Sequence, residues 1–166
     1  MPGLPFRNYV DLRTILFLYL LHFFFICLTV VTLNLITASF ITWLIYLSLL
    51  FLLGYKHAAN KNRPLASSFI GGAFGQLPAI ILSLIIIAGI FSGSYYRLFV
   101  FDAYDFLLQV WHTSLAPVFT LLPSSSMLGI PLYYWVTIAA SFFYPSVFFL
   151  GAVFGFLSRT KTSPAC

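Results

Sequence analysis

Residues Ser67–Ala79 read SSFIGGAFGQLPA, and the fold can be predicted outward from this stretch. Gly71 and Gly75 are four residues apart, with Ser67 one helical turn earlier and Ala79 one turn later. Residues four apart lie on the same face of a helix, so the segment predicts a helical strip without bulky side chains. In a membrane, such a strip allows a second helix to approach closely.

A similar strip lies near the C-terminus. Phe149–Leu157 reads FLGAVFGFL against FIGGAFGQL at Phe69–Leu77, and five of the nine positions are identical. The identical positions include both glycines, which are Gly151 and Gly155 in the second copy. Because lipid provides no hydrophobic force between helices, small residues are what permit close packing. We therefore expect the two strips to pack against each other, within one chain or between two copies.

The same similarity has a functional alternative, which is a remnant inverted repeat. Pro78 and Pro145 each lie thirteen residues from the expected cytoplasmic end of their helix, and both are candidate hinges. Helices interrupted by glycine or proline at corresponding positions indicate a transport site at the bilayer midplane. His22 and Gln76 would be the polar residues to test in such a transporter. Close helix packing alone is the simpler interpretation.

The composition decides the class of protein. Of the 166 residues, 61% are hydrophobic and only 7% are charged, whereas soluble domains carry about 25% charged residues. The apolar runs are long and do not alternate as the strands of a membrane barrel do. We therefore predict an all-α integral membrane protein with a single domain over residues 1–166. Cys27 and Cys166 form no CxxC pair, which argues against a disulfide-exchange enzyme, and no cofactor is expected.

Four uncharged runs predict transmembrane helices over residues 14–35, 40–55, 65–91 and 130–158. The first run is longer than the apolar core of a signal peptide, so we interpret it as an uncleaved span. The second run is short for a crossing, and Pro78 interrupts the third. The basic residues lie in short segments between the runs. That distribution orients a membrane protein and does not predict nucleic-acid binding.

Residues 102–122 form a different kind of segment. Asp102, Asp105, Gln109 and His112 follow the spacing of one helix face, and Trp111 with its apolar neighbours fills another. This pattern predicts an amphipathic helix that is interfacial or re-entrant. If the segment does not cross the membrane, seven of the eight Lys and Arg residues share one side; if it crosses, the ratio is five to three. The positive-inside rule favours four spans, with both termini cytoplasmic, in the plasma (inner) membrane.

Ionisable side chains in apolar surroundings are the candidate functional groups. His22 lies about 12 Å into the first span, where it can relay protons or, as a neutral imidazole, join neighbouring helices. Asp102, Asp105 and His112 can bind a metal ion from one helix face. Asp105 and His112 can also act as a base and an acid. The simpler interpretation is that this polar face contacts water, so a catalytic or metal site is the weaker hypothesis.

The expected function is defined mostly by exclusion. The chain contains no nucleotide-binding motif, no catalytic motif and little polar mass outside the apolar runs. We expect a non-enzymatic accessory, assembly or scaffold subunit of a larger membrane complex. Its partners would be the lipid bilayer and either a membrane protein or a second copy, contacted through the glycine-lined helices. The alternative is a small oligomeric transporter or channel subunit, and a membrane enzyme that uses Asp105 and His112 comes third.

Overall fold

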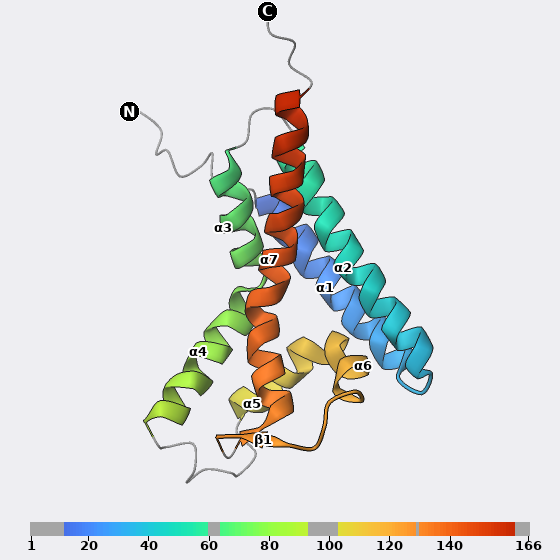
Figure 1. The fold of residues 1–166 in the computed structure, drawn as a ribbon, viewed down its shortest axis with the longest axis vertical. Coiled ribbons are helices and arrows are strands. Elements are labelled where there is room, and N and C mark those ends of the chain that lie inside the picture. The colour runs from blue at the N-terminus through green and yellow to red at the C-terminus, as the bar shows by residue number, and fades with distance from the viewer. Residues whose placement is uncertain (1–11, 60–63, 93–102, 129, 162–166) are drawn as a thin grey trace, which may run out of the picture. The chain divides into compact units, whose positions relative to one another are not determined.

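The computed structural model describes residues 12–59, 64–92, 103–128 and 130–161, and the described chain is mostly helical (Figure 1). Three helices are long and apolar enough to cross a membrane, namely α1 (Leu12–Thr32), α2 (Ile36–Ala59) and α7 (Leu132–Lys161). A fourth candidate span consists of α3 (Leu65–Gly75) and α4 (Leu77–Phe91), which are bent by 67° at their junction. These helices agree with the predicted all-α membrane class. The described residues thus contain three candidate spans, or four if the bent pair is one span.

The segment between α4 and α7 contains shorter elements. α5 (Ala103–Trp111) continues as the 3₁₀ helix η3 (His112–Leu115) and the single turn α6 (Ala116–Phe119). A hairpin of two antiparallel strands, β1 (Ser126–Met127) and β2 (Ile130–Pro131), precedes α7. The helix predicted over 102–122 is therefore divided after Trp111, and Asp102 lies outside the described residues. Pro117 cannot donate a hydrogen bond to the carbonyl of Thr113, which disfavours a continuous α-helix at this point.

The hairpin of α1 and α2 differs from the prediction in its length. α2 contains 24 residues, which is enough to cross a bilayer, whereas the sequence predicted a short helix over 40–55. At its N-terminal end, α2 begins before the polar residue Ser39. The Ser39 hydroxyl is satisfied inside the helix pair, because it donates to the carbonyl oxygen of Thr32 at 2.6 Å. At the other end, Lys56 and His57 lie in the last turn, where positive charge interacts favourably with the helix dipole.

The chain divides into two compact units, and α1, α2 and α7 each contribute to both. The first unit comprises Met1–His22, Leu44–Gln76 and Phe143–Cys166. The second unit comprises Phe23–Trp43 and Leu77–Phe142. Each unit has its own buried apolar side chains, such as Leu50 and Phe148 in the first and Leu108 and Ile130 in the second.

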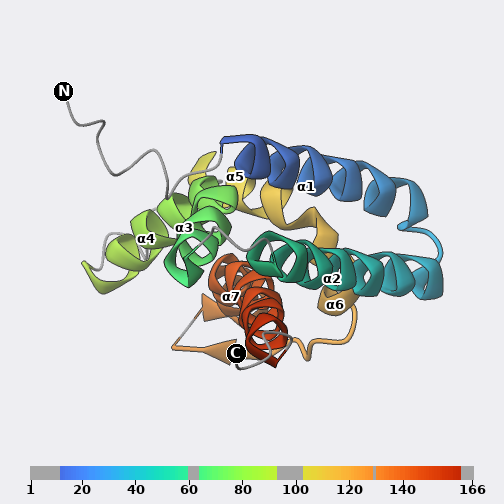
Figure 2. The same cartoon turned by 90° about the horizontal axis from the view of Figure 1, so that it is seen from above.

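In the first unit, α2 and α7 are in backbone contact because glycines leave out the side chains where the helices meet (Figure 2). A Cβ atom added to Gly151 would overlap the carbonyl oxygen of Phe51, and one added to Gly155 would overlap that of Tyr55. At these two glycines only the second Cα hydrogen atom fits against the carbonyl oxygen of α2. Such contacts resemble the weak Cα–H···O hydrogen bonds found between closely packed helices. The later residue of α7, Gly155, meets the later residue of α2, Tyr55. α2 and α7 therefore run in the same direction.

The glycines of α3 face other neighbours. A Cβ atom on Gly72 would lie 3.3 Å from the carbonyl oxygen of Pro145 in α7, and one on Gly75 would lie 2.8 Å from Cδ1 of Leu18 in α1. A Cβ atom on Gly71 would have no neighbour within 4 Å. Within one chain, the predicted contact of strip against strip is therefore not formed. α3 does meet α7, but through Gly72, while the glycines of α7 are occupied by the backbone of α2.

The interruption of the third predicted span falls at Gln76, two residues before Pro78. Gln76 has φ −116° and ψ 16°, which is outside the helical region. Pro78 lies in the first turn of α4, where its missing N–H is not needed. In a continuous helix its ring would clash with the carbonyl group of Phe74, so the helix ends before it. Pro145, the other candidate hinge, lies inside α7, which continues through it.

Candidate functional site

Buried polar side chains of the first unit form a hydrogen-bonded group, the His22 cluster, which consists of His22, Tyr46 and Gln76. His22 Nδ1 is 2.7 Å from the hydroxyl oxygen of Tyr46, and Gln76 Nε2 donates to the same oxygen at 3.3 Å. His22 and Tyr46 are fully buried, and Gln76 is 5% exposed. The ring of Tyr144 packs edge-on against that of Tyr46, with centroids 5.2 Å apart. The cluster therefore joins α1 and α2 to the break between α3 and α4.

The structure thus brings His22 and Gln76 together through a residue that the sequence did not single out. Tyr46 lies in a long apolar run, where an aromatic residue gives no sign of a polar role. Gln76 reaches the cluster because it lies at the helix break, where its backbone N–H bonds to the end of α3. A space of about 10 Å³ beside Gln76 and Tyr144 has room for about one water molecule.

Replacing His22 with asparagine is expected to leave the protein folded, because the amide can still hydrogen-bond to Tyr46 in the same space. Replacing it with leucine removes the bond and leaves the Tyr46 hydroxyl with one partner fewer, at a cost of about 1–3 kcal/mol in the free energy of unfolding. Unfolding of both variants in detergent, followed by circular dichroism, measures the difference. Equal stability of the two variants would mean that the bond contributes nothing to folding.

In the second unit, α5 turns its polar side inward. His112, directly after α5, is fully buried, and Asp105 and Gln109 are partly buried. Phe106 and Leu107 are each 50% exposed. The sequence predicted that the polar face contacts water, but the structure places it against the first turns of α7 (Figure 1).

Two sets of hydrogen bonds join this face to α7. The Tyr134 hydroxyl donates to Asp105 Oδ2 at 3.5 Å, and Gln109 Nε2 donates to the Tyr134 hydroxyl at 3.5 Å. His112 Nε2 lies 2.8 Å from Ser141 Oγ. Asp105 and His112 are seven residues apart, as are Tyr134 and Ser141, so the contact extends over about 10 Å along both elements.

Ser83 of α4 adds a third element to this arrangement. Its hydroxyl oxygen is 2.8 Å from Ser141 Oγ, and Ser83, His112 and Ser141 are each no more than 1% exposed. We refer to these residues together as the α5–α7 polar row, which consists of Ser83, Asp105, Gln109, His112, Tyr134 and Ser141. Asp105 is the single acidic residue in the described part of the second unit, which contains no lysine or arginine.

The residues considered for metal binding do not form a site in the described chain. Asp102 lies outside the described residues, and Asp105 and His112 hydrogen-bond to different residues of α7. Within 12–59, 64–92, 103–128 and 130–161, no three His, Cys, Asp or Glu side chains are grouped so that they could hold an ion. Asp105 and His112 are also the candidates for acid–base chemistry. In the structure, His112 lies at hydrogen-bonding distance from the hydroxyl of Ser141, and Asp105 accepts a hydrogen bond from that of Tyr134.

Ser67, the first residue of the strip in α3, makes polar contacts at the start of that helix. Its hydroxyl donates to the carbonyl oxygen of Pro64 at 2.8 Å and lies 3.4 Å from His57 Nε2. The other ring nitrogen of His57 lies 3.4 Å from Thr14 Oγ1. His57 therefore connects the beginning of α1, the end of α2 and the beginning of α3.

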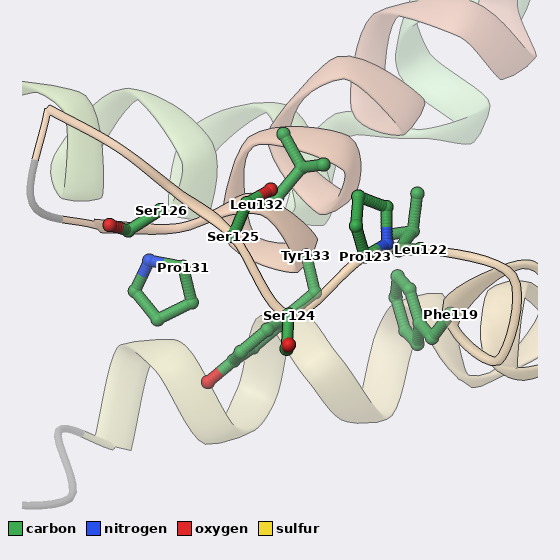
Figure 3. Close-up of a pocket in the computed structure, with 9 residues that line it drawn as sticks. All are labelled: Phe119, Leu122, Pro123, Ser124, Ser125, Ser126, Pro131, Leu132 and Tyr133. Atoms are coloured by element: carbon green, nitrogen blue, oxygen red, sulfur yellow. The ribbon is translucent and has the colours of Figure 1, made fainter.

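A cavity of about 370 Å³ lies where the loop after α6 meets the start of α7 (Figure 3). Its lining combines two aromatic rings, two prolines, two leucines and three serines: Phe119, Leu122, Pro123, Ser124, Ser125, Ser126, Pro131, Leu132 and Tyr133. No residue of the lining carries a charge at neutral pH. Such a lining favours an apolar or neutral occupant over an ion.

Comparison with known proteins adds no assignment to this geometry. No protein-family model matches the chain, and no curated protein or solved structure shows significant similarity to it. The buried polar groups are the features of this chain that point to a function, because ionisable residues inside a membrane are costly and commonly functional.

Proposed function

We propose that the chain is a subunit of a small membrane transporter or channel whose conduction path follows the α5–α7 polar row. The orientation of α5 carries this proposal. A helix on the membrane surface turns its polar side to water, whereas α5 exposes Phe106 and Leu107 and turns Asp105 and Gln109 towards α7. This arrangement suits a re-entrant segment surrounded by lipid. Buried polar side chains at membrane depth are typical of ion and substrate pathways.

The break between α3 and α4 supports the same class of function. Discontinuous helices in transporters bring polar groups and unpaired backbone atoms to a site inside the membrane. Gln76, at the break, hydrogen-bonds into the His22 cluster. The sequence alone favours an accessory subunit, because it predicts few polar groups inside the fold. The inward polar face of α5 weakens that argument, because it adds buried groups that the sequence pattern assigned to water.

The topology that we propose has four spans, with both termini on the cytoplasmic side of the plasma (inner) membrane. The parallel contact of α2 and α7 supports it, because the chain must then cross an odd number of times between these helices. One crossing by α3 and α4 satisfies this requirement. α5, η3 and α6 contain nine, four and four residues, and each is much shorter than the roughly 20 residues of a spanning helix.

Cysteine labelling is expected to place the loop after α6 outside the cell. In a variant without Cys27 and Cys166, Ser125→Cys should react with a membrane-impermeant maleimide added to intact cells. Lys56→Cys, at the end of α2, should react only after the cells are permeabilised. The physical reason is that α5–α6 returns to the side it came from. Protection of Ser125→Cys in intact cells would contradict the four-span topology.

Reconstitution into vesicles tests the proposed function. Vesicles that contain the purified protein are expected to be more permeable to ions or small solutes than protein-free vesicles, measured by internal dyes and by osmotic swelling. Ser141→Ala removes the hydroxyl that joins α4, η3 and α7, so it should reduce the permeability. The matched control is Ser48→Ala, because Ser48 is exposed and bonds only to its own helix at Leu44. Wild-type vesicles no more permeable than empty ones would overturn the proposal.

The accessory subunit is the second candidate, and the exposure of two helices favours it. In the most apolar 18-residue stretch of each helix, 28% of α1 and 22% of α2 are buried, compared with 44% of α7. These apolar faces can be covered by lipid or by a partner helix. Purification in mild detergent followed by mass spectrometry distinguishes the two functions. A stoichiometric partner together with impermeable vesicles would favour the accessory subunit over the transporter.

A further inference from the structure

We propose that the ion carried along the α5–α7 polar row is the proton and that His112 is the group that binds it. This inference rests on the proposed function and names its substrate. His112 is a fully buried imidazole whose Nε2 lies at hydrogen-bonding distance, 2.8 Å, from a serine hydroxyl. A second serine hydroxyl follows at 2.8 Å. Imidazole and hydroxyl groups both donate and accept hydrogen bonds, so a chain of them can pass protons.

The chemistry of the row favours the proton over other ions. Lysine and arginine are the side chains that most often hold an anion, and the described part of the second unit contains neither. Calcium and magnesium require about six or more oxygen ligands, whereas Asp105 supplies the single carboxylate of this row. The centre formed by Ser83, His112 and Ser141 is also closed, with each residue at most 1% exposed. A proton needs no cavity, because it moves by exchange between hydrogen-bonded atoms.

The transfer step balances with one water molecule as the final acceptor. A protonated His112 gives the proton on Nε2 to Ser141 Oγ while the hydroxyl proton of Ser141 passes to Ser83 Oγ, and Ser83 gives its own proton to that water molecule. Each serine oxygen gains one proton and loses one, so charge moves without any change in covalent structure. The other titratable groups of the row are Asp105 on α5 and Tyr134 on α7, which hydrogen-bond to each other. α4 contributes the hydroxyl of Ser83.

The experiment compares glutamine substitutions at two histidines, one in the polar row and one outside it. Glutamine at position 112 can still hydrogen-bond to Ser141, but it cannot bind a proton near neutral pH. Vesicles containing a pH-sensitive dye, with valinomycin and a potassium gradient to drive protons, report the flux. We expect His112→Gln to lower the flux to that of protein-free vesicles while its unfolding temperature stays close to wild type. His57→Gln, the matched control, changes a half-buried histidine of the first unit that belongs to neither the polar row nor the His22 cluster, and it should keep the wild-type flux.

The possible outcomes separate the proton from the transport function. Equal proton flux in wild type and His112→Gln would overturn the role of His112 and leave the transport function standing. Vesicles that pass other ions or solutes but no protons would overturn the choice of the proton alone. Wild-type vesicles that pass neither would overturn the transport function and this inference together. A loss of flux in His112→Gln with a matching loss of thermal stability would count against proton binding as the role of His112.

Discussion

Gly151→Ala is expected to destabilise the protein by about 1–3 kcal/mol, with the upper end of that range the more realistic because the obstacle is backbone. The added methyl group would overlap the carbonyl oxygen of Phe51 in α2. A flexible side chain could rotate away, but a backbone carbonyl moves only if the whole helix moves. Gly54 in α2 lies against the carbonyl of Phe148 in the same way, so a displaced α2 would lose contacts along the whole interface.

Gly71→Ala is the matched control, and its effect should have the opposite sign. A Cβ atom at Gly71 meets nothing within 4 Å, and alanine is favoured over glycine inside a helix by about 0.5–1 kcal/mol. Unfolding of both variants in mixed micelles of increasing denaturing-detergent content measures the two changes side by side. Equal destabilisation at the two positions would mean that α7 packs against α3 through the strips, as the sequence alone suggested.

Leu107→Lys is expected to cost about 1–3 kcal/mol, because a lysine level with the first turns of α7 lies between the interface, where the penalty is small, and the membrane centre, where it is about 2.5–3.5 kcal/mol. Leu107 is 50% exposed on α5, and in the proposed topology its surroundings are lipid. If α5 lay on the membrane surface in contact with water, an exposed lysine would cost less than about 0.5 kcal/mol. The substitution therefore distinguishes a re-entrant α5 from an interfacial one by a large difference in stability.

The control for this substitution is Leu121→Lys. Leu121 is 68% exposed in the turn after α6, where the proposed topology places it in contact with water at the outer surface. Expression level and detergent unfolding of the two lysine variants should therefore differ, with Leu121→Lys close to wild type. A well-folded Leu107→Lys protein of normal stability would mean that water surrounds the exposed side of α5. The orientation of α5 would then no longer support the transport proposal.

The amino-acid sequence by itself determined where the helices form. In lipid, every backbone N–H and C=O must be bonded within its own segment, so a long uncharged run forms a helix whatever its neighbours are. The sequence also predicted an interruption near Pro78, because proline excludes the helical bond and clashes with the carbonyl four residues earlier. The break falls at Gln76 instead. Proline is tolerated in the first turn of a helix, so Pro78 is part of α4 and the non-helical residue is the one that precedes this helix.

The polarity of the two faces of α5 could be predicted, but their direction could not. Asp105, Gln109 and His112 lie on one side by helical spacing alone. Which side faces inward depends on whether the surroundings are water or lipid, and periodicity does not distinguish the two. The tertiary structure places the polar side against Tyr134 and Ser141 of α7.

Helix partners were decided by the tertiary structure alone. A glycine strip states that a close neighbour is possible, but it suits any helix whose backbone can reach it. Gly151 and Gly155 meet α2 because α2 offers Gly54 at the matching height, so both helices can approach without side chains between them. Tyr46 is the partner of His22 because the packing of α1 against α2 brings the two side chains together. Contact between residues far apart in the chain depends on how whole helices pack, which local sequence patterns do not encode.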